Sequence, residues 1–298
     1  MSNVEPRFGR LITAMVTPFN DERELDLDRA QALATRLIEG GNDSLIINGT
    51  TGESPTVFYP QKIELFRAVV EAVGGKAPVI ANVGDNCTAD TVDFAKDVAK
   101  LGVDGFMCVV PYYNKPPQEG MYQHFKTIAD AVELPIILYN IPGRCVVNME
   151  AETTLRLAND CENIIAVKEA SGKMDQIATI AAAAPEGFSV YSGDDSATYD
   201  IMRLGGAGVI STTGNVAPER MKELVTKCAE GKWGEGWDAH EALLPLMNGL
   251  FATSNPILVK EALKLVGFPV GGVRLPLIDA TAEQSARLAS IMREVGVL

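Results

Sequence analysis

Eight short apolar runs, each followed by a stretch with helical spacing, are the feature that most limits how this 298-residue chain can fold. The runs cover residues 11–16, 44–48, 78–83, 105–110, 135–140, 163–168, 188–192 and 207–211. Apolar residues recur at helical intervals between them, in segments such as 28–39, 61–73, 91–101, 121–131 and 151–158. Strands that alternate with helices pair in parallel, because right-handed crossovers return the chain in the same direction. Eight such units predict an α/β fold, a (β/α)8 TIM barrel.

A doubly wound open sheet is the alternative, but it usually has fewer units, and no G-x-G-x-x-G follows the first run. Three further helical patterns, at residues 233–250, 256–266 and 281–295, come after the eighth unit. No Ser/Gly-rich linker precedes them. The sequence therefore predicts a barrel over residues 1–231 and a C-terminal helical region over residues 232–298 that packs on the barrel.

The charge of the chain bears on its partners. There are 26 Lys and Arg residues against 39 Asp and Glu residues, so the net charge is −13. This balance opposes attraction to nucleic acid or to an anionic membrane, and we expect neither as a partner. Residues 1–10 lack the apolar segment of a signal peptide, and no apolar stretch is long enough to span a membrane. We expect a cytoplasmic protein.

Metal and histidine chemistry find little support in the sequence. The only histidines are His124 and His240, outside any H-E-x-x-H pattern, and the five cysteines show no C-x-x-C spacing. We expect no metal site and no Ser-His-Asp triad. Other groups must carry any chemistry.

The carboxyl ends of the predicted strands are where a barrel of this kind holds its active site. Lys168 ends one run, and burial there would lower the pKa of its amine and make it a nucleophile that can form a Schiff base with a carbonyl substrate. The alternative is a lysine that reaches the surface or pairs with Glu169. Tyr139 ends the preceding run, where its phenol could relay protons, or where its ring could simply pack in the core.

Other candidates lie in the loops. Tyr112 and Tyr113 stand in a proline-stiffened loop that suits a site element or an interface, and residues 49–54 offer backbone N–H groups and hydroxyls to a carboxylate. That turn has no Walker ending, and a plain turn is its alternative. Arg144 could bind a carboxylate or face solvent. The pair Asp194 and Asp195 is interpreted as a helix cap.

Together these segments resemble a known family. Gly49-Thr50-Thr51-Gly52-Glu53, Tyr139-Asn140-Ile141-Pro142 and Lys168-Glu169-Ala170, in this order, resemble the class I aldolase family of dihydrodipicolinate synthase and N-acetylneuraminate lyase. The likeness spans nearly the whole chain. Arg144, after Tyr-Asn-Ile-Pro, resembles the dihydrodipicolinate synthase branch, since the lyase branch lacks that arginine.

The resemblance implies a cofactor-free lyase that condenses pyruvate with aspartate-4-semialdehyde through an imine on lysine, on the route to diaminopimelate and lysine. It implies a homotetramer built from two tight dimers. The matching catalytic positions are Lys168, Tyr139, Thr50, Thr51 and Tyr113, the last reaching in from an adjacent subunit. The matching substrate-binding positions are Thr51, Arg144, Gly193 and Ile210. Two alternatives stay open: a pyruvate-dependent aldolase acting on a sugar acid, and a non-catalytic carboxylate-binding barrel.

Many members of this family bind lysine as an inhibitor at the tight-dimer interface. The matching positions are Ser54, Pro55, Tyr59, Lys62, Asn86, Asp90 and Tyr112. Lysine-sensitive bacterial members tend to carry histidine at the positions of Tyr59 and Lys62. The Lys62 ammonium would repel the amine of the effector, so the sequence predicts little or no inhibition by lysine.

Overall fold

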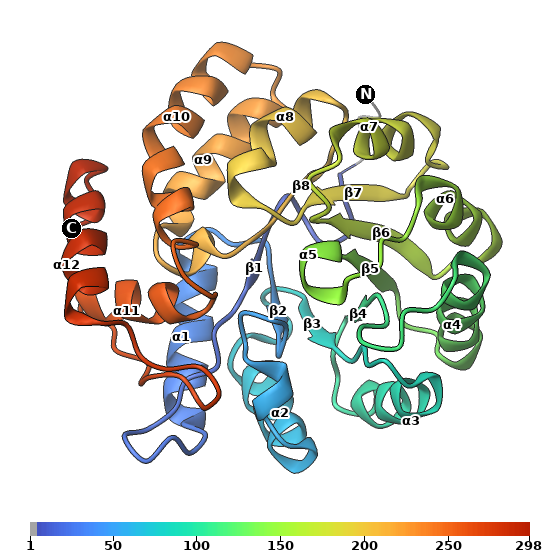
Figure 1. Cartoon of the computed structure of the whole chain (residues 1–298), viewed down its shortest axis with the longest axis horizontal. Coiled ribbons are helices and arrows are strands. Elements are labelled where there is room, and N and C mark those ends of the chain that lie inside the picture. Colours follow the sequence, from blue (N-terminus) through green and yellow to red (C-terminus); the bar gives the residue numbers. More distant parts are fainter. Residues whose placement is uncertain (1–4) are drawn as a thin grey trace.

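A closed barrel of eight parallel strands forms the centre of the computed structural model, which describes residues 5–298 (Figure 1). The strands follow one another around the barrel in chain order, and β1 pairs with β8. They are β1 (Leu11–Ala14), β2 (Ser44–Ile47), β3 (Val79–Asn82), β4 (Gly105–Val109), β5 (Ile136–Asn140), β6 (Ile164–Glu169), β7 (Ser189–Ser192) and β8 (Gly208–Ser211). The predicted (β/α)8 barrel is confirmed. Residues 1–4, which belong to the N-terminal segment and to the predicted barrel unit 1–231, lie outside the described residues.

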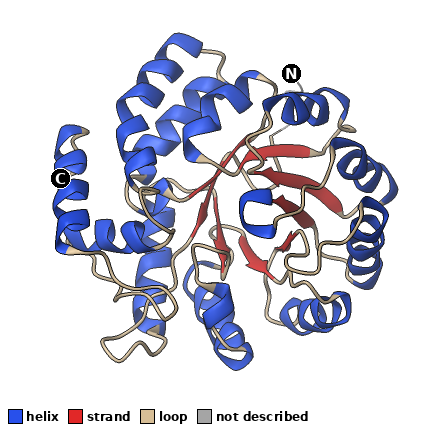
Figure 2. Ribbon diagram, viewed as in Figure 1, coloured by secondary structure: helices blue, strands red, loops and turns tan. Residues whose placement is uncertain are grey.

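Helices surround this barrel (Figure 2). Those between strands are α1 (Leu27–Glu39), α2 (Tyr59–Val73), α3 (Thr88–Ala99), α4 (Gln118–Ala131), α6 (Ala151–Asp160), α7 (Met174–Ala183) and α8 (Thr198–Arg203). Short turns of helix follow several strands directly: η1 (Ser54–Thr56), α5 (Pro142–Cys145), η2 (Asp195–Ala197) and η3 (Thr213–Asn215). The predicted segments begin two or three residues after the true starts of α2, α3 and α4. The first turns of these helices lack the regular spacing of apolar residues from which the helices were predicted.

Two apolar cores result from the alternation of side chains along each strand. One fills the barrel interior and includes Phe8, Ile46, Ile137 and Ile210. The larger one lies between the outer face of the strands and the helices. The interior is therefore packed, and the free space for a ligand lies at the ends of the strands.

Register across β5, β6 and β7 sets the candidate residues side by side. Tyr139 pairs with Lys168, and Lys168 pairs with Tyr191. Tyr139, Tyr191 and Ala166 belong to the interior core, and Lys168 lies two residues after Ala166 on the same face. The Lys168 side chain therefore points into the barrel.

Four helices follow β8: α9 (Pro218–Ala229), α10 (Trp233–Gly249), α11 (Ile257–Leu265) and α12 (Ala282–Glu294). The three helices predicted at the C-terminal end are confirmed. Lys260 of α11 forms an ion pair with Glu53, which joins this region to the turn after β2. The division of the chain at residue 231 stays a prediction. Within residues 5–298, no helix has the length and hydropathy that a membrane span requires.

Candidate active site

Lys168 is the buried amine at the centre of the candidate site. Its side chain is only 6% exposed, and its Nζ lies 4.4 Å from the centroid of the Tyr139 ring. It does not pair with Glu169, whose carboxylate accepts hydrogen bonds from Asn140 and from the Ser171 hydroxyl. Lys168 forms no ion pair with any described residue. Both alternatives from the sequence, a surface lysine and a Glu169 pair, are thereby excluded.

Burial sets the chemistry of this amine. Loss of hydration lowers the pKa of Lys168 to about 8, because the charged form is disfavoured in the barrel interior. The Asp195 carboxylate opposes this shift, and the Arg144 guanidinium adds to it. Near pH 8 a large fraction of the amine is neutral and available as a nucleophile.

Tyr139 lies beside this amine at the end of β5. Burial raises the pKa of its phenol to about 12, while Arg144 and a hydrogen bond with Thr50 act in the opposite direction. The phenol therefore stays protonated at neutral pH. It can donate a proton to a group bound near Lys168 and recover one from a neighbour such as Thr50.

The turn after β2 presents Thr50 and Thr51 at the same end of the barrel. Asn48 and Glu53 adopt left-handed backbone conformations, with φ of 61° and 56°. Gly52 suits this turn because a Cβ there would lie only 3.0 Å from the backbone of Asn48, a tight contact. The Gly52 carbonyl accepts a hydrogen bond of 2.6 Å from the Thr17 hydroxyl. These contacts hold the buried Thr51 side chain over the barrel.

A cavity of about 260 Å³ opens beside these residues. Its walls include residues from both predicted sets: Thr50, Tyr139 and Arg144 from the substrate and catalytic set, and Ser54, Pro55, Lys62 and Tyr112 from the effector set. Lys168 and Thr51 are buried and are not among its lining residues. The structure thus places the Lys168 amine, the Tyr139 phenol and the Arg144 guanidinium at one end of the barrel.

Comparison with known proteins shows the family of the chain. The profile of the dihydrodipicolinate synthetase family matches residues 7–295. The chain belongs to that family. It is 52% identical over 292 residues to 4-hydroxy-tetrahydrodipicolinate synthase of Moorella thermoacetica. The alignment covers 98% of this chain and 100% of the relative. It is 50% identical over 293 residues to the enzyme of the same name from Symbiobacterium thermophilum, with coverage of 98% and 100%.

Solved structures agree with the fold. The crystal structure of DHDPS from Cyanidioschyzon merolae with lysine bound superposes with a TM-score of 0.97 and is 45% identical, covering 99% of this chain and 100% of that one. The DHDPS structure from Thermotoga maritima superposes with a TM-score of 0.95 at 42% identity, with 97% and 99% covered. The chain is therefore an enzyme, a lyase of the dihydrodipicolinate synthetase family.

The remaining predicted residues of this family member lie at different depths. Ile210 belongs to the barrel interior with Tyr139. Gly193 follows β7, where a Cβ would lie 2.8 Å from the Cβ of Ala170, so only glycine lets the two strand ends approach. Tyr113 is 88% exposed, has a φ of 71° and does not line the cavity of this single chain. Its predicted role needs a second copy and stays a prediction.

Four of the seven predicted effector residues, Ser54, Tyr59, Lys62 and Asp90, line a neighbouring cavity of about 390 Å³. Pro55 and Tyr112 line the 260 Å³ cavity instead, and Asn86 is a lining residue of neither. The Lys62 Nζ lies 5.6 Å from the centroid of the Phe94 ring. Burial lowers the pKa of Lys62, and the Asp85 carboxylate opposes that shift. The Asn86 side chain donates to the Tyr112 carbonyl, and the Tyr112 hydroxyl donates to Asp85. Sequence analysis missed the carboxylates of Asp85, Asp93 and Asp97.

Asp195 corrects the interpretation of the Asp194–Asp195 pair as a helix cap. Asp194 does cap η2, since its side chain accepts from the Ser196 N–H. Asp195 is buried instead, and its Oδ2 accepts from the backbone N–H groups of Thr212 and Thr213. It joins the loops after β7 and β8, close enough to Lys168 to affect its pKa. No local pattern reveals this, because the partners lie in the loop after another strand, β8.

Two further groups that the sequence analysis assigned no role contact the site from the C-terminal region. The Asn255 side chain donates a hydrogen bond of 2.8 Å to the Thr51 hydroxyl. Lys260 and Glu53 form an ion pair of 2.6 Å in which both side chains are 2% exposed. A buried charge inside the apolar pattern of the last helices is the one sequence signal that marks Lys260.

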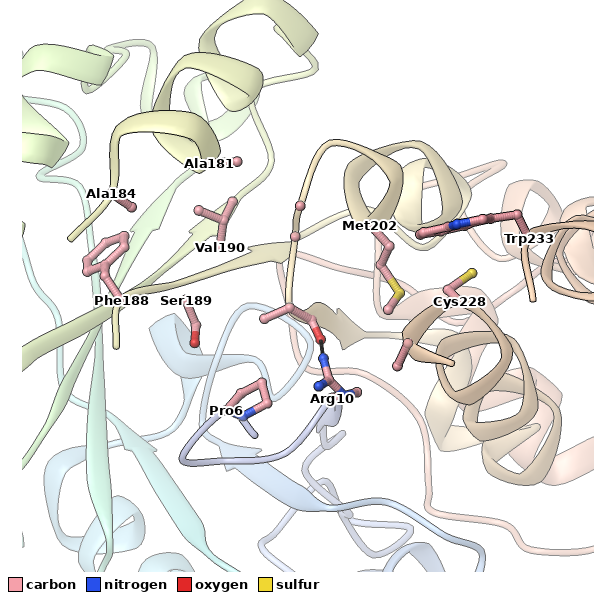
Figure 3. Close-up of a pocket in the computed structure, with 14 residues that line it drawn as sticks. Pro6, Arg10, Ala181, Ala184, Phe188, Ser189, Val190, Met202, Cys228 and Trp233 are labelled. Atoms are coloured by element: carbon pink, nitrogen blue, oxygen red, sulfur yellow. Dashed lines mark hydrogen bonds between the residues drawn. The ribbon is translucent and has the colours of Figure 1, made fainter. Parts of the chain in front are cut away.

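A different cavity, of about 200 Å³, lies at the amino-terminal end of β7 and β8 (Figure 3). Phe188 and Trp233 stand on opposite sides of it, and Arg10 donates from Nη1 to the Ala207 carbonyl at 3.0 Å. None of the predicted site residues lines it. Among residues 5–298, no cluster of three or more His, Cys, Asp or Glu side chains is arranged to hold a metal ion.

Proposed function

We propose that this chain condenses pyruvate with L-aspartate-4-semialdehyde to give 4-hydroxy-tetrahydrodipicolinate, in the diaminopimelate and lysine pathway, through a Schiff base on Lys168. Relatives that match over almost their full length carry the name of that enzyme. One observation carries the mechanism. Lys168 is a buried amine, unpaired among the described residues, with its Nζ 4.4 Å from the centroid of the Tyr139 ring.

Covalent catalysis by this amine proceeds in balanced steps. The neutral Lys168 amine adds to the keto carbon of pyruvate, and loss of water gives an iminium. Loss of a methyl proton gives the enamine, whose carbon attacks the aldehyde of the second substrate. The amino group of that substrate then attacks the imine carbon, closes the ring and displaces Lys168. No cofactor takes part.

Each of these steps moves a proton, and we assign that task to Tyr139, Thr50 and Tyr113. Tyr139 is a protonated phenol beside the Lys168 amine, and Thr50 is its hydrogen-bonding neighbour. Tyr113 is exposed on a loop in the left-handed backbone region, which suits insertion into the site of a second copy. Positioned acids and bases of this kind typically contribute about 10²–10⁴-fold.

The two substrate carboxylates need separate donors. We assign the pyruvate carboxylate to the Thr51 hydroxyl and the turn around it, and the semialdehyde carboxylate to the Arg144 guanidinium on the cavity wall. Gly193 and Ile210 line the space between them in this proposal. Arg144 also lowers the pKa of Lys168, so binding and nucleophile activation share one cation.

We infer that the enzyme works in the cytoplasm as a homotetramer, a dimer of tight dimers, without nucleic acid, membrane or metal. The net charge of −13 supports the absence of a polyanionic partner. The exposed aromatic rings of Phe58, Tyr59 and Tyr113 support a subunit interface on the side of the barrel that carries them.

Lysine binding in the cavity beside Lys62 would be weak. The Cyanidioschyzon merolae relative holds lysine in its crystal structure. In this chain, the Lys62 ammonium lies near Asp85 and already neutralises part of the negative charge of this cavity. The amine of a free lysine would therefore find less attraction there. We expect little inhibition at physiological lysine. Strong, cooperative inhibition at submillimolar lysine would contradict this, and Lys62→His should sensitise the enzyme if Lys62 is the cause.

Borohydride reduction in the presence of pyruvate tests the mechanism. We expect a stable adduct that peptide mass mapping places on Lys168, and product formation when the semialdehyde is added in a coupled assay. Lys173→Ala is the matched control, because Lys173 is exposed five residues away. An adduct on Lys173 or Lys115, or one that persists without Lys168, would overturn the Schiff-base assignment.

A further inference from the structure

We propose that Asn255, in the segment before α11, is a positioning residue that holds the Thr51 hydroxyl as a hydrogen-bond donor toward the carboxylate of the first substrate. The inference rests on the proposed function for the role of Thr51. It adds a residue 204 positions away in the chain to the machinery that binds pyruvate.

The direction of one hydrogen bond carries the inference. Asn255 Nδ2 donates to Thr51 Oγ1 at 2.8 Å, and both side chains are buried. A threonine hydroxyl has one proton and two acceptor lone pairs. Because the amide occupies a lone pair, the hydroxyl proton is left to point elsewhere. A carboxylate accepts only, so a hydroxyl oriented in this way is ready to bind it.

The side-chain amide of Asn255 makes no hydrogen bond other than this one with any described residue. Its Oδ1 is buried and has no hydrogen-bond partner among the described residues. The Thr212 hydroxyl lies 3.5 Å from Thr51 Oγ1, which is long for a hydroxyl pair, so the amide is the closer partner. A buried polar group normally has a hydrogen-bond partner, and the Thr51 hydroxyl is the partner of this side chain.

The same residue also contacts the group assigned to the second carboxylate. Its backbone carbonyl accepts a hydrogen bond of 3.4 Å from Arg144 Nη2. Asn255 therefore lies between the Thr51 hydroxyl and the Arg144 guanidinium. Its side chain serves one of them and its main chain the other, so a change of side chain should affect the first substrate selectively.

The buried Lys260–Glu53 ion pair holds this segment against the turn. Lys260 also donates to the Gly272 carbonyl at 2.8 Å, and Glu53 accepts from the Arg274 N–H at 2.9 Å. The turn is thus tied to the C-terminal region at Thr51 and again at Glu53, two residues later. The Lys260–Glu53 ion pair lies next to the Asn255–Thr51 hydrogen bond in both segments, so it helps to keep the Asn255 amide and the Thr51 hydroxyl at a fixed distance.

Two substitutions at Asn255 separate positioning from packing. Asn255→Asp keeps the shape but can only accept while ionised, so it should turn the Thr51 proton inward and away from pyruvate. Asn255→Ala frees the hydroxyl and leaves a small void. We expect the KM for pyruvate to rise at least about tenfold in Asn255→Asp and less in Asn255→Ala. The KM for the semialdehyde should change less than twofold in both. Asn248→Asp, at an exposed position of α10, is the matched control.

The outcomes are distinguishable. A purely structural role would make Asn255→Ala the worse variant and would change both substrates together, and either result overturns the proposal. An unchanged KM for pyruvate in a folded Asn255→Asp variant would also overturn the proposal. Lowering the pH should partly rescue Asn255→Asp, since a protonated carboxyl donates again, and should not rescue Asn255→Ala. If Asn255→Ala does not fold, Asn255→Ser replaces it. Failure of the wild-type chain to form a pyruvate adduct would instead refute the proposed function.

Discussion

Two lysines of this chain are buried to a similar extent and differ in what surrounds them. Lys168, at the barrel mouth, is 6% exposed and faces the Tyr139 ring without an ion-pair partner among the described residues. Lys260, at the junction with the C-terminal helices, is 3% exposed over the whole residue, pairs with Glu53 at 2.6 Å and donates to the Gly272 carbonyl. Burial lowers the pKa of both amines to about 8.

A lowered pKa therefore does not identify a nucleophile by itself. Lys260 donates to a carboxylate and a carbonyl, which are both acceptors, so it is held as an ammonium without a lone pair for attack on a substrate. The Lys168 amine faces the Tyr139 ring and has no ion-pair or hydrogen-bond partner among the described residues, so no such partner occupies its lone pair when the amine is neutral. Partner geometry, added to burial, is what distinguishes the lysine proposed as the nucleophile from the structural one.

The largest expected effect comes from Lys168→Met. Turnover should fall by about 10³-fold or more, as for the loss of other covalent nucleophiles, and the borohydride-trapped pyruvate adduct should disappear. Thermal unfolding should show no loss of stability, because the variant replaces an uncompensated buried amine with an apolar side chain. A clear loss of stability would mean that Lys168 has a structural partner after all.

Lys260→Met is the matched substitution in the other region. It leaves the Glu53 carboxylate buried without its cation, which should cost about 3–5 kcal/mol in the free energy of unfolding. Urea or thermal denaturation measures this. The double variant Lys260→Met with Glu53→Gln should recover most of the loss. Pyruvate trapping on Lys168 should persist in any folded Lys260 variant. Loss of trapping in such a variant would contradict a purely structural role for Lys260.

Arg144→Ala should weaken binding of the semialdehyde. A carboxylate that loses a charge-assisted hydrogen bond loses about 1.5–3 kcal/mol, or roughly 10- to 100-fold in KM. Pyruvate trapping should survive. Because Arg144 lowers the pKa of Lys168, the pH midpoint for trapping should move upward in the variant. Equal losses for both substrates would show that Arg144 supports the fold instead.

The smallest effect is the pH dependence of the wild type. The pKa of Lys168 is about 8, so the trapping rate should rise about tenfold per pH unit well below pH 8 and level off above it. The sign for stability follows from the same shift. An unfolded lysine, with a pKa of about 10.4, holds more protons between pH 8 and 10, so this group stabilises folding as the pH rises through that window. Lys168→Met should remove its share of that rise, and an unchanged slope would contradict the assigned pKa.

Sequence reasoning located the two residues of the candidate site that lie at strand ends. Lys168 and Tyr139 each close an apolar run, and the position of a residue along a strand follows from its neighbours in the chain. Asp195 shows the limit. The same aspartate pair contains a local cap, which sequence rules predict, and a buried tie to Thr212 and Thr213, which they do not. Only closure of the barrel brings the two loops together.

Local periodicity by itself determined the eight strands, the helices between them and the three helices at the C-terminal end, because alternation and helical spacing are properties of neighbouring residues. The tertiary structure alone decided which charges are paired. The local sequence places Lys168 at the end of a strand and Lys260 in a helix, but it does not show that Lys260 has a carboxylate partner and Lys168 has none among the described residues. Asn255 meets Thr51, and Lys260 meets Glu53, across about two hundred residues. The pKa of a buried group and the direction of its hydrogen bonds are set by its burial and by its partners. In this protein both are supplied by elements that are distant in the chain.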